Sequence, residues 1–131
     1  QMETAIKPGD IVKAVYKSGV YVGEVVEVKE ERRKGVIKVL AVLKHPDQGD
    51  LHHPGLADVP LFHQRKALAY QEKVNVPLHL LTPYEGEIPD YRSSLLEAVS
   101  KELKKLEQND SPWARMALQH LQTLREEYER L

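Results

Sequence analysis

The sequence predicts an α+β fold in which a mainly β region comes first and an α-helical region follows. Two patterns along the 131 residues indicate this order. Up to residue 91, short apolar runs are separated by turn residues, which is typical of β-strands. From residue 92 onward, apolar side chains recur three and four positions apart, as they do on one face of a helix. We therefore divide the chain into a β region, residues 2–91, and a helical region, residues 92–131.

Three strands are predicted early in the chain. A Pro-Gly-Asp turn at residues 8–10 precedes a first strand at residues 11–16, which is rich in β-branched residues. A second strand covers residues 20–28, and Gly23 is a candidate β-bulge within it. We expect one face of this strand to carry Val20, Val22, Val26 and Val28. An apolar run inside residues 35–44 predicts a third, central strand that is buried on both faces.

The rest of the β region is less regular. Residues 29–34 are all charged, and we interpret them as a solvated hairpin tip, while a basic docking patch at residues 32–34 stays open. Residues 61–70 return to apolar character and predict one more strand. Prolines and a glycine interrupt residues 74–89, where we expect short extended pieces and turns. Strands of this length and spacing favour a small SH3-like β-barrel.

The helical region predicts two helices. The first runs from residue 93 to about residue 107, and its apolar stripe contains Leu95, Leu96, Val99, Leu103 and Leu106. The sequence Asp110-Ser111-Pro112 then supplies a capping side chain and a proline suited to the first helical turn. A second helix follows from residue 112 to about residue 130. Because only about four residues link the two helices, we expect an antiparallel two-helix hairpin.

A long irregular loop, residues 45–60, separates the third strand from the next predicted element. Loops of this length in compact domains are usually functional or disordered. The slightly longer stretch 45–63 holds seven side chains of metal-ligand type: His45, Asp47, Asp50, His52, His53, Asp58 and His63. They define an alternative in which the chain is a divalent-metal-dependent hydrolase. We prefer the interpretation that these side chains cap the backbone of the loop and make it a rigid recognition surface.

Other reaction chemistries lack a motif. The chain has no cysteine, which excludes disulfides, thiolate metal sites, thiol nucleophiles and cysteine-linked lipid anchors. It also has no Gly-x-Ser-x-Gly elbow, no glycine-rich phosphate loop and no His-Glu-x-x-His spacing. We therefore predict a protein that is not an enzyme and that has neither a cofactor nor a metal site.

The charge balance argues against nucleic acid as a partner. Lys and Arg number 19 and Asp and Glu number 20, which gives a net charge of −1. Contacts with phosphates supply most of the affinity for nucleic acid, and they require a positive excess. A nucleic-acid-binding barrel remains a further alternative, with Arg32, Arg33, Lys34, Arg65 and Lys66 as its basic residues. Neither a membrane span nor a signal-peptide pattern is visible, so we expect a cytoplasmic protein.

The central part of the sequence carries a family resemblance. Its distinctive segments are LKHPDQGDLH at 43–52, ADV at 57–59, LFH at 61–63, ALA at 67–69 and NVP at 75–77. Shorter matching segments are GDIV at 9–12, GE at 23–24, PDY at 89–91 and DSP at 110–112. With these segments the chain resembles, over nearly its whole length, the kinase-associated protein B family of spore-forming bacilli, also called kinase-associated lipoprotein B.

The resemblance implies a non-catalytic accessory protein that supports a membrane sensor histidine kinase feeding the sporulation phosphorelay. It implies no enzymatic activity and no established cofactor. The chain would reach the inner face of the membrane only through the kinase, and a homodimer is left open. We expect the loop to contact the kinase, and the helical hairpin and a groove on the barrel surface stay open as alternative contact surfaces. The predicted contact residues are His45, Gln48, Asp50, Leu51, His52, Asp58, Phe62, His63 and Arg65.

Overall fold

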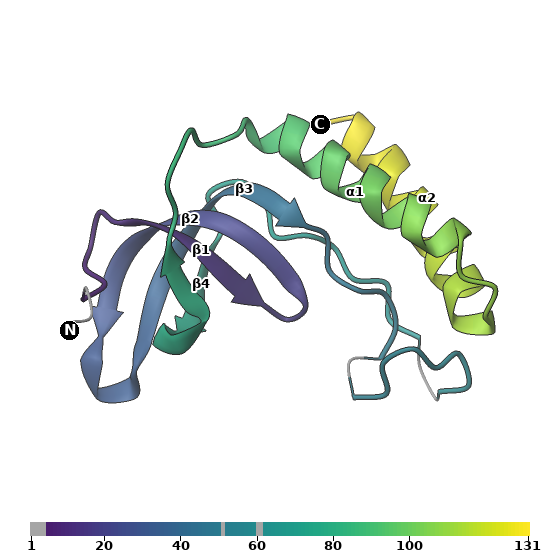
Figure 1. Cartoon of the computed structure of the whole chain (residues 1–131), viewed down its shortest axis with the longest axis horizontal. Helices are drawn as coiled ribbons and strands as arrows, with labels where there is room; N and C mark the ends of the chain where they lie inside the picture. Colours follow the sequence, from purple (N-terminus) through teal and green to yellow (C-terminus); the bar gives the residue numbers. More distant parts are fainter. Residues whose placement is uncertain (1–4, 51, 60–61) are drawn as a thin grey trace.

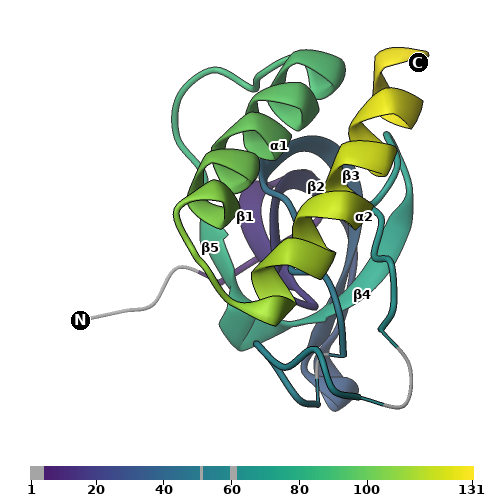
Figure 2. The ribbon, with the colours of Figure 1, turned by 90° about the vertical axis from the view of Figure 1, so that its right-hand side faces the viewer.

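A computed structural model describes residues 5–50, 52–59 and 62–131 of the chain. An antiparallel sheet comes first and two helices follow, as the sequence predicts. Figure 1 shows the helices lying above one end of the sheet, and Figure 2 shows them side by side in front of it. The α+β fold class is therefore confirmed.

The sheet has five strands in the order β4-β3-β2-β1-β5. A 3₁₀ turn, Leu78–Leu80, joins the two edge strands, so the sheet curls back toward itself. This order and this connection give the small barrel-like fold that we expected, although the two edge strands do not pair with each other in the described sheet. The strands are β1 (Ile11–Tyr16), β2 (Gly19–Lys29), β3 (Lys34–Lys44), β4 (Lys73–Pro77) and β5 (Leu81–Pro83).

Bulges bend the long β2–β3 hairpin and change which side chains point inward. The pairing of the two strands shifts register at three places along β2, one of them between Val22 and Gly23. The bulge predicted at Gly23 is thus confirmed, and a Cβ there would lie 2.8 Å from the backbone oxygen of Lys38. The predicted apolar face is wrong at Val26, which is 40% exposed, whereas Val25 beside it is buried. A strict two-residue alternation cannot pass through a bulge unchanged.

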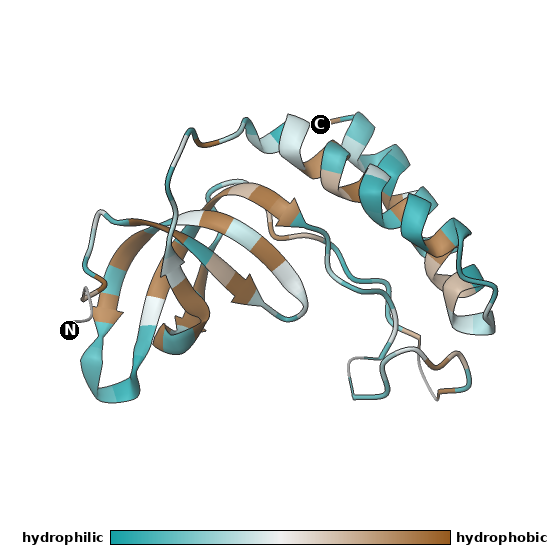
Figure 3. Cartoon of the chain, in the orientation of Figure 1, coloured by the Kyte–Doolittle hydropathy of each residue, from teal (hydrophilic) through white to brown (hydrophobic). Residues whose placement is uncertain are grey.

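Two hydrophobic clusters share the sheet. One fills the curled end and contains Val12, Ala14, Val25, Ile37, Val76 and Leu81. The other joins Tyr21, Val39 and Val42 of the sheet to the apolar stripes of both helices. Figure 3 shows these stripes as hydrophobic bands on otherwise hydrophilic helices. The helical hairpin therefore packs back on the sheet through a common core.

The two helices begin at capping residues. Helix α1 (Tyr91–Glu107) starts two residues earlier than predicted, because Asp90 accepts a hydrogen bond from the backbone N–H of Ser93 at 3.0 Å. Helix α2 (Pro112–Glu129) starts as predicted, with the Ser111 hydroxyl accepting from the N–H of Ala114 at 3.1 Å.

Helix α1 also covers part of the outer edge of β3. Strand β4 pairs with β3 only up to Lys38, which leaves the later residues of β3 without a partner strand on that side. The hydroxyl of Ser94, itself buried, accepts a hydrogen bond from the Val42 N–H at 3.0 Å and donates to the Tyr91 carbonyl at 2.9 Å. A helix side chain thus replaces a strand partner at this position.

The strand predicted at residues 61–70 is wrong within the described part, residues 62–70, which contains no strand. Its backbone N–H groups are bound by side chains instead. The N–H of Ala67 donates to the Tyr128 hydroxyl at 3.0 Å and that of Leu68 to the Tyr21 hydroxyl at 3.3 Å. Apolar character indicated burial correctly here, but the hydrogen-bond partners are side chains from distant parts of the chain.

Candidate functional site

The loop after β3 divides into a buried base and an exposed tip. The loop base comprises residues 45–50 together with the returning residues 62–66, and the loop tip comprises residues 52–59. Within the base, His45, Pro46, Gln48 and Gly49 are buried, whereas most of the tip is exposed. Figure 1 shows the two arms of the loop running side by side toward the tip, below the helices. The hydrogen bonds of the base reach both the helices and the turn between β1 and β2.

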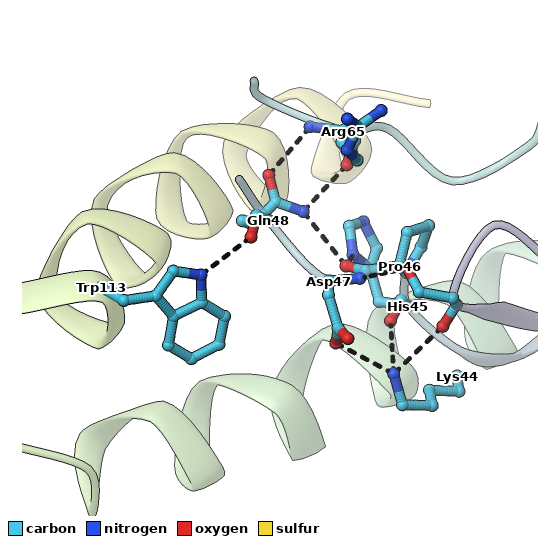
Figure 4. A network of polar contacts seen from close by, with 8 residues as sticks. Lys44, His45, Pro46, Asp47, Gln48, Arg65 and Trp113 are labelled. Atoms are coloured by element: carbon cyan, nitrogen blue, oxygen red, sulfur yellow. Dashed lines mark hydrogen bonds and ion pairs between the residues drawn. The ribbon is translucent and has the colours of Figure 1, made fainter. Parts of the chain in front are cut away.

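Gln48 holds the two arms of the base together (Figure 4). Its side-chain oxygen accepts from the Arg65 N–H at 2.9 Å, and its side-chain nitrogen donates to the Arg65 carbonyl at 2.9 Å. The same nitrogen donates to the Pro46 carbonyl at 3.1 Å. Because an amide side chain presents a donor and an acceptor side by side, Gln48 pairs with Arg65 much as a neighbouring strand would.

Trp113 connects the base to α2. Its indole N–H donates to the Gln48 carbonyl at 3.0 Å. Gly49, the next residue, has a φ of +103°. A Cβ on Gly49 would be 3.2 Å from the indole nitrogen of Trp113 and 3.1 Å from the Phe62 ring. Phe62 in turn stacks on His120 of α2 with ring centroids 5.2 Å apart. Glycine is required at this position both by the backbone conformation and by the closeness of the two rings.

His45 is a buried hydrogen-bonding group of the base. Its Nδ1 lies 2.9 Å from the Pro46 carbonyl, which can only accept, so Nδ1 carries the hydrogen. Its Nε2 therefore accepts from the Tyr128 hydroxyl at 2.9 Å, and that hydroxyl accepts from the Ala67 N–H. Burial lowers the pKa of His45 to about 4, so the ring is neutral at neutral pH. It therefore ties the end of β3 to the last turn of α2.

The turn between β1 and β2 is fastened to the same base. Lys44 Nζ donates to the Ser18 carbonyl and to Asp47 Oδ1, each at 3.1 Å. The Asp47 N–H donates back to the Ser18 hydroxyl at 2.9 Å. Figure 4 shows Lys44 and Asp47 meeting below the Gln48 side chain. Sheet, loop and helices therefore converge on one set of polar contacts.

At the end of the base, Asp50 caps the backbone of the tip, as we expected for the polar residues of this loop. One carboxylate oxygen accepts from the His52 N–H at 2.9 Å, and the other lies 3.0 Å from His53 Nδ1. These hydrogen bonds, that of His53 first, hold the pKa of the Asp50 carboxyl below its ordinary value. The tip therefore begins in a defined turn.

The predicted contact residues fall into three groups. His45 and Gln48 are buried and hold the base together. Asp50, Phe62 and Arg65 are half-buried, and His52, Asp58 and His63 are exposed. Leu51 lies outside the described residues. Three residues that sequence reasoning did not assign to the site, Trp113, His120 and Tyr128, complete it. Their positions on the helical stripe gave no signal for this role, because the loop residues that they contact are more than fifty residues away.

The side chains that suggested other activities are dispersed. His45 binds Tyr128 and His53 lies on Asp50, so the histidines turn to different partners. Among the described residues, no three His, Asp or Glu side chains gather where they could hold a metal ion. The basic residues of the β2–β3 turn lie at the end of the molecule opposite the loop, as Figure 1 shows for that turn. No helix within residues 5–50, 52–59 and 62–131 combines the length and the apolar character that a membrane span requires.

Comparison with known proteins gives matches that cover nearly all of the chain. The family model described as kinase associated protein B matches residues 16–129. Kinase-associated lipoprotein B of Bacillus subtilis (strain 168) is 50% identical over 125 residues, which are 95% of this chain and 96% of that protein. The X-ray crystal structure of kinase-associated protein B from Bacillus cereus is similar with a TM-score of 0.80 at 38% identity, covering 95% of this chain and 99% of that one.

Proposed function

The chain belongs to the kinase-associated protein B family, and from this we propose that it is a non-catalytic accessory protein that binds a sensor histidine kinase and supports its activation in the sporulation phosphorelay. The observation that carries the proposal is the likeness over 95% of the chain to proteins whose names describe association with a kinase. Membership also confirms the resemblance visible in the sequence. The cytoplasmic location at the inner face of the membrane, reached through the kinase, is part of the same proposal.

We favour the loop tip, with the exposed residues that return from it, as the surface that meets the kinase. The base beneath it is fixed by the Gln48 and His45 hydrogen bonds, and within the tip the Leu56 N–H donates to the His53 carbonyl at 3.3 Å. A preorganised loop loses little conformational entropy on binding. Leu56 at the tip is 52% exposed and supplies an apolar side chain four residues after the exposed His52. An exposed apolar side chain on a rigid loop is a suitable anchor for a protein partner.

The helical hairpin is the less suitable surface. Its apolar stripes are already buried between the helices and the sheet, including Leu95, Val99, Leu103, Leu121 and Leu124. The outward faces are charged and exposed, and such faces make weak, salt-sensitive contacts. Packing of the hairpin on a helical bundle of the kinase would require these stripes to leave their present core.

The test is a titration of the full chain with the cytoplasmic fragment of the sensor kinase. The single tryptophan, Trp113, touches the loop base and provides an intrinsic fluorescence signal. We expect the wild-type chain to bind and the double substitution His52→Ala with Leu56→Ala to weaken binding roughly tenfold or more. The matched control, Glu31→Ala with Arg32→Ala in the β2–β3 turn, keeps the wild-type affinity.

Two results would contradict the proposal in different ways. If the wild-type chain does not bind the fragment by calorimetry or fluorescence, the accessory role as stated is wrong. If the tip variant binds as tightly as the wild type while the chain stays folded, the kinase meets another surface.

A further inference from the structure

A basic hollow lies beside the loop base, on the side of the β1–β2 turn. It has a volume of about 370 Å³ and opens between that turn, Pro46 and the returning residues 63–66. Tyr16 and Tyr21 give it aromatic walls. A space of this size accommodates one or two side chains of a partner and is at the lower end of the range for ligand sites.

Positive charge gathers in the hollow although the chain as a whole has a net charge of −1. Lys17, Arg65 and Lys66 line it, and the one acidic residue among its walls is Glu72. The Glu72 carboxylate already accepts a hydrogen bond from the Ala69 N–H at 2.8 Å. Within the described residues Lys66 pairs with Glu127 at 3.2 Å, whereas neither Lys17 nor Arg65 forms an ion pair. The hollow is therefore lined by two cationic side chains that form no ion pair within the described residues.

Both cations are held in position. The Arg65 Nε–H donates to the Gly49 carbonyl at 2.9 Å, and the Arg65 backbone is fixed on both sides by Gln48. Lys17 lies in the left-handed backbone region with a φ of +45°, and its ammonium is 5.4 Å from the centre of the Tyr16 ring. Such fixed donors lose little freedom when an anion arrives, and the half-buried Tyr16 ring helps to place the ammonium.

We propose that this basic hollow binds an acidic side chain, Asp or Glu, of the protein partner. Arg65 and Lys17 both line the hollow, a guanidinium and an ammonium each bind carboxylates, and the aromatic walls can cover the methylene stem of an acidic side chain. With Lys66 paired to Glu127, Lys17 and Arg65 against Glu72 leave one net positive charge at the hollow, which matches a singly charged carboxylate. The inference rests on the proposed function, since it names the chemistry by which the kinase is recognised.

The first arm of the test uses simple probes with the isotope-labelled full chain. A short peptide of alternating Asp and Glu is titrated while the backbone amide signals are followed by NMR. We expect signals of Lys17, Arg65 and Lys66 to shift, the affinity to fall as sodium chloride is raised, and Lys17→Glu to abolish the shifts. The peptide with Asn and Gln in the same places leaves the signals unmoved. If inorganic phosphate shifts them at lower concentration than the acidic peptide does, the assignment to carboxylate is overturned.

The second arm uses the cytoplasmic kinase fragment. We expect Lys17→Glu to weaken its binding roughly tenfold, and Lys34→Glu, the same charge change in the β2–β3 turn, to leave it unchanged. Lys17 has no ion pair within the described residues and lies in an exposed turn, so this variant should remain folded. Equal binding by wild type and Lys17→Glu overturns the inference and leaves the proposed function standing. If the fragment fails to bind at all, the proposed function falls, and the peptide arm alone decides whether the hollow takes carboxylates.

Discussion

Single residues in the loop base replace the secondary structure that the chain lacks there. Gln48 bonds three backbone groups, His45 donates to one of the same three, the Pro46 carbonyl, and the Tyr128 hydroxyl binds a fourth group, the Ala67 N–H. Buried backbone groups without partners are costly, so these side chains are the reason that an irregular segment can be buried at all. The sequence could not indicate this, because neither Gln48 nor Tyr128 belongs to a motif, and their partners are far away along the chain.

Replacing Gln48 by Ala should destabilise the fold. The change leaves the N–H and the carbonyl of Arg65 and the carbonyl of Pro46 without that partner, and we expect a loss of about 2–4 kcal/mol in the free energy of unfolding. Urea unfolding followed by Trp113 fluorescence measures it. Gln119→Ala, at an exposed position of α2, is the control and should change the free energy by less than about 0.5 kcal/mol. Similar losses in both variants would contradict the role of Gln48.

The buried His45 should make stability depend on pH. Its pKa is lowered from 6.5 to about 4 in the folded chain, mainly by burial. Between these values the unfolded chain binds a proton that the folded chain does not, so stability is full above about pH 6.5 and falls as the pH drops toward 4. His45 alone lowers the free energy of unfolding by roughly 3 kcal/mol between these two pH values, and it causes no further loss at lower pH.

Urea unfolding of the wild type and of His45→Gln at several pH values between 4 and 7.5 tests this. The variant is less stable at neutral pH, but its stability falls less between pH 6.5 and 4. His52→Gln, a change at an exposed histidine, is the control. If the free energy of unfolding of His45→Gln depends on pH as strongly as that of the wild type, His45 is not the cause of the pH dependence.

At the scale of elements, the sequence predicted what depends on near neighbours. Strands β1 to β3 and both helices lie close to their predicted positions, because alternation, turns and the caps at Asp90 and Ser111 are local features. Two predictions, the side on which Val26 lies and the strand after the loop, were wrong. Val26 points outward because bulges shift the pairing of β2 with β3, and residues 62–70 bond side chains instead of a strand. Both outcomes depend on a second segment, which periodicity in the first cannot reveal.

Tyr128→Phe should loosen the returning segment from the end of α2. The change removes the hydroxyl that binds both the Ala67 N–H and His45. We expect the free energy of unfolding to fall by about 1–3 kcal/mol, and hydrogen exchange at the Ala67 amide to be faster than in the wild type. Tyr84→Phe removes an exposed hydroxyl bond to Glu87 and serves as the control. Unchanged exchange at Ala67 in Tyr128→Phe would mean that the hydroxyl does not hold this segment.

At the scale of the whole molecule, the helical region after residue 91 packs on the same sheet that forms the barrel. Residues on β2 and β3 contribute to the cluster inside the barrel and to the cluster under the helices. Such sharing couples the packing of the helices to the strands that also carry the barrel core. The division into two regions describes the order of elements along the chain, while the packing joins them.

We therefore expect a single cooperative unfolding transition. Far-UV circular dichroism, which reports all elements, and Trp113 fluorescence, which reports the helix and loop side, should give the same urea midpoint. Ile37→Ala, in the barrel cluster, should lower the free energy of unfolding by about 2–5 kcal/mol. The urea midpoint reported by Trp113 should therefore fall as well. Separate midpoints, or a Trp113 transition that ignores Ile37→Ala, would mean that the two regions unfold independently.

The hydrogen bond from the Val42 N–H to Ser94 has a further consequence for recognition. Many partners bind by adding an extended segment to the open edge of a sheet, where main-chain groups await a neighbour. Beyond Lys38 this edge of β3 has no paired strand, but the backbone of Val39 bonds that of Gln71 and Glu72, and at Val42 the start of α1 occupies the edge. A visiting strand would have to displace Ser94, and with it the packed first turn of α1. A partner therefore cannot bind this edge by main-chain hydrogen bonds to β3, and it must contact side chains instead.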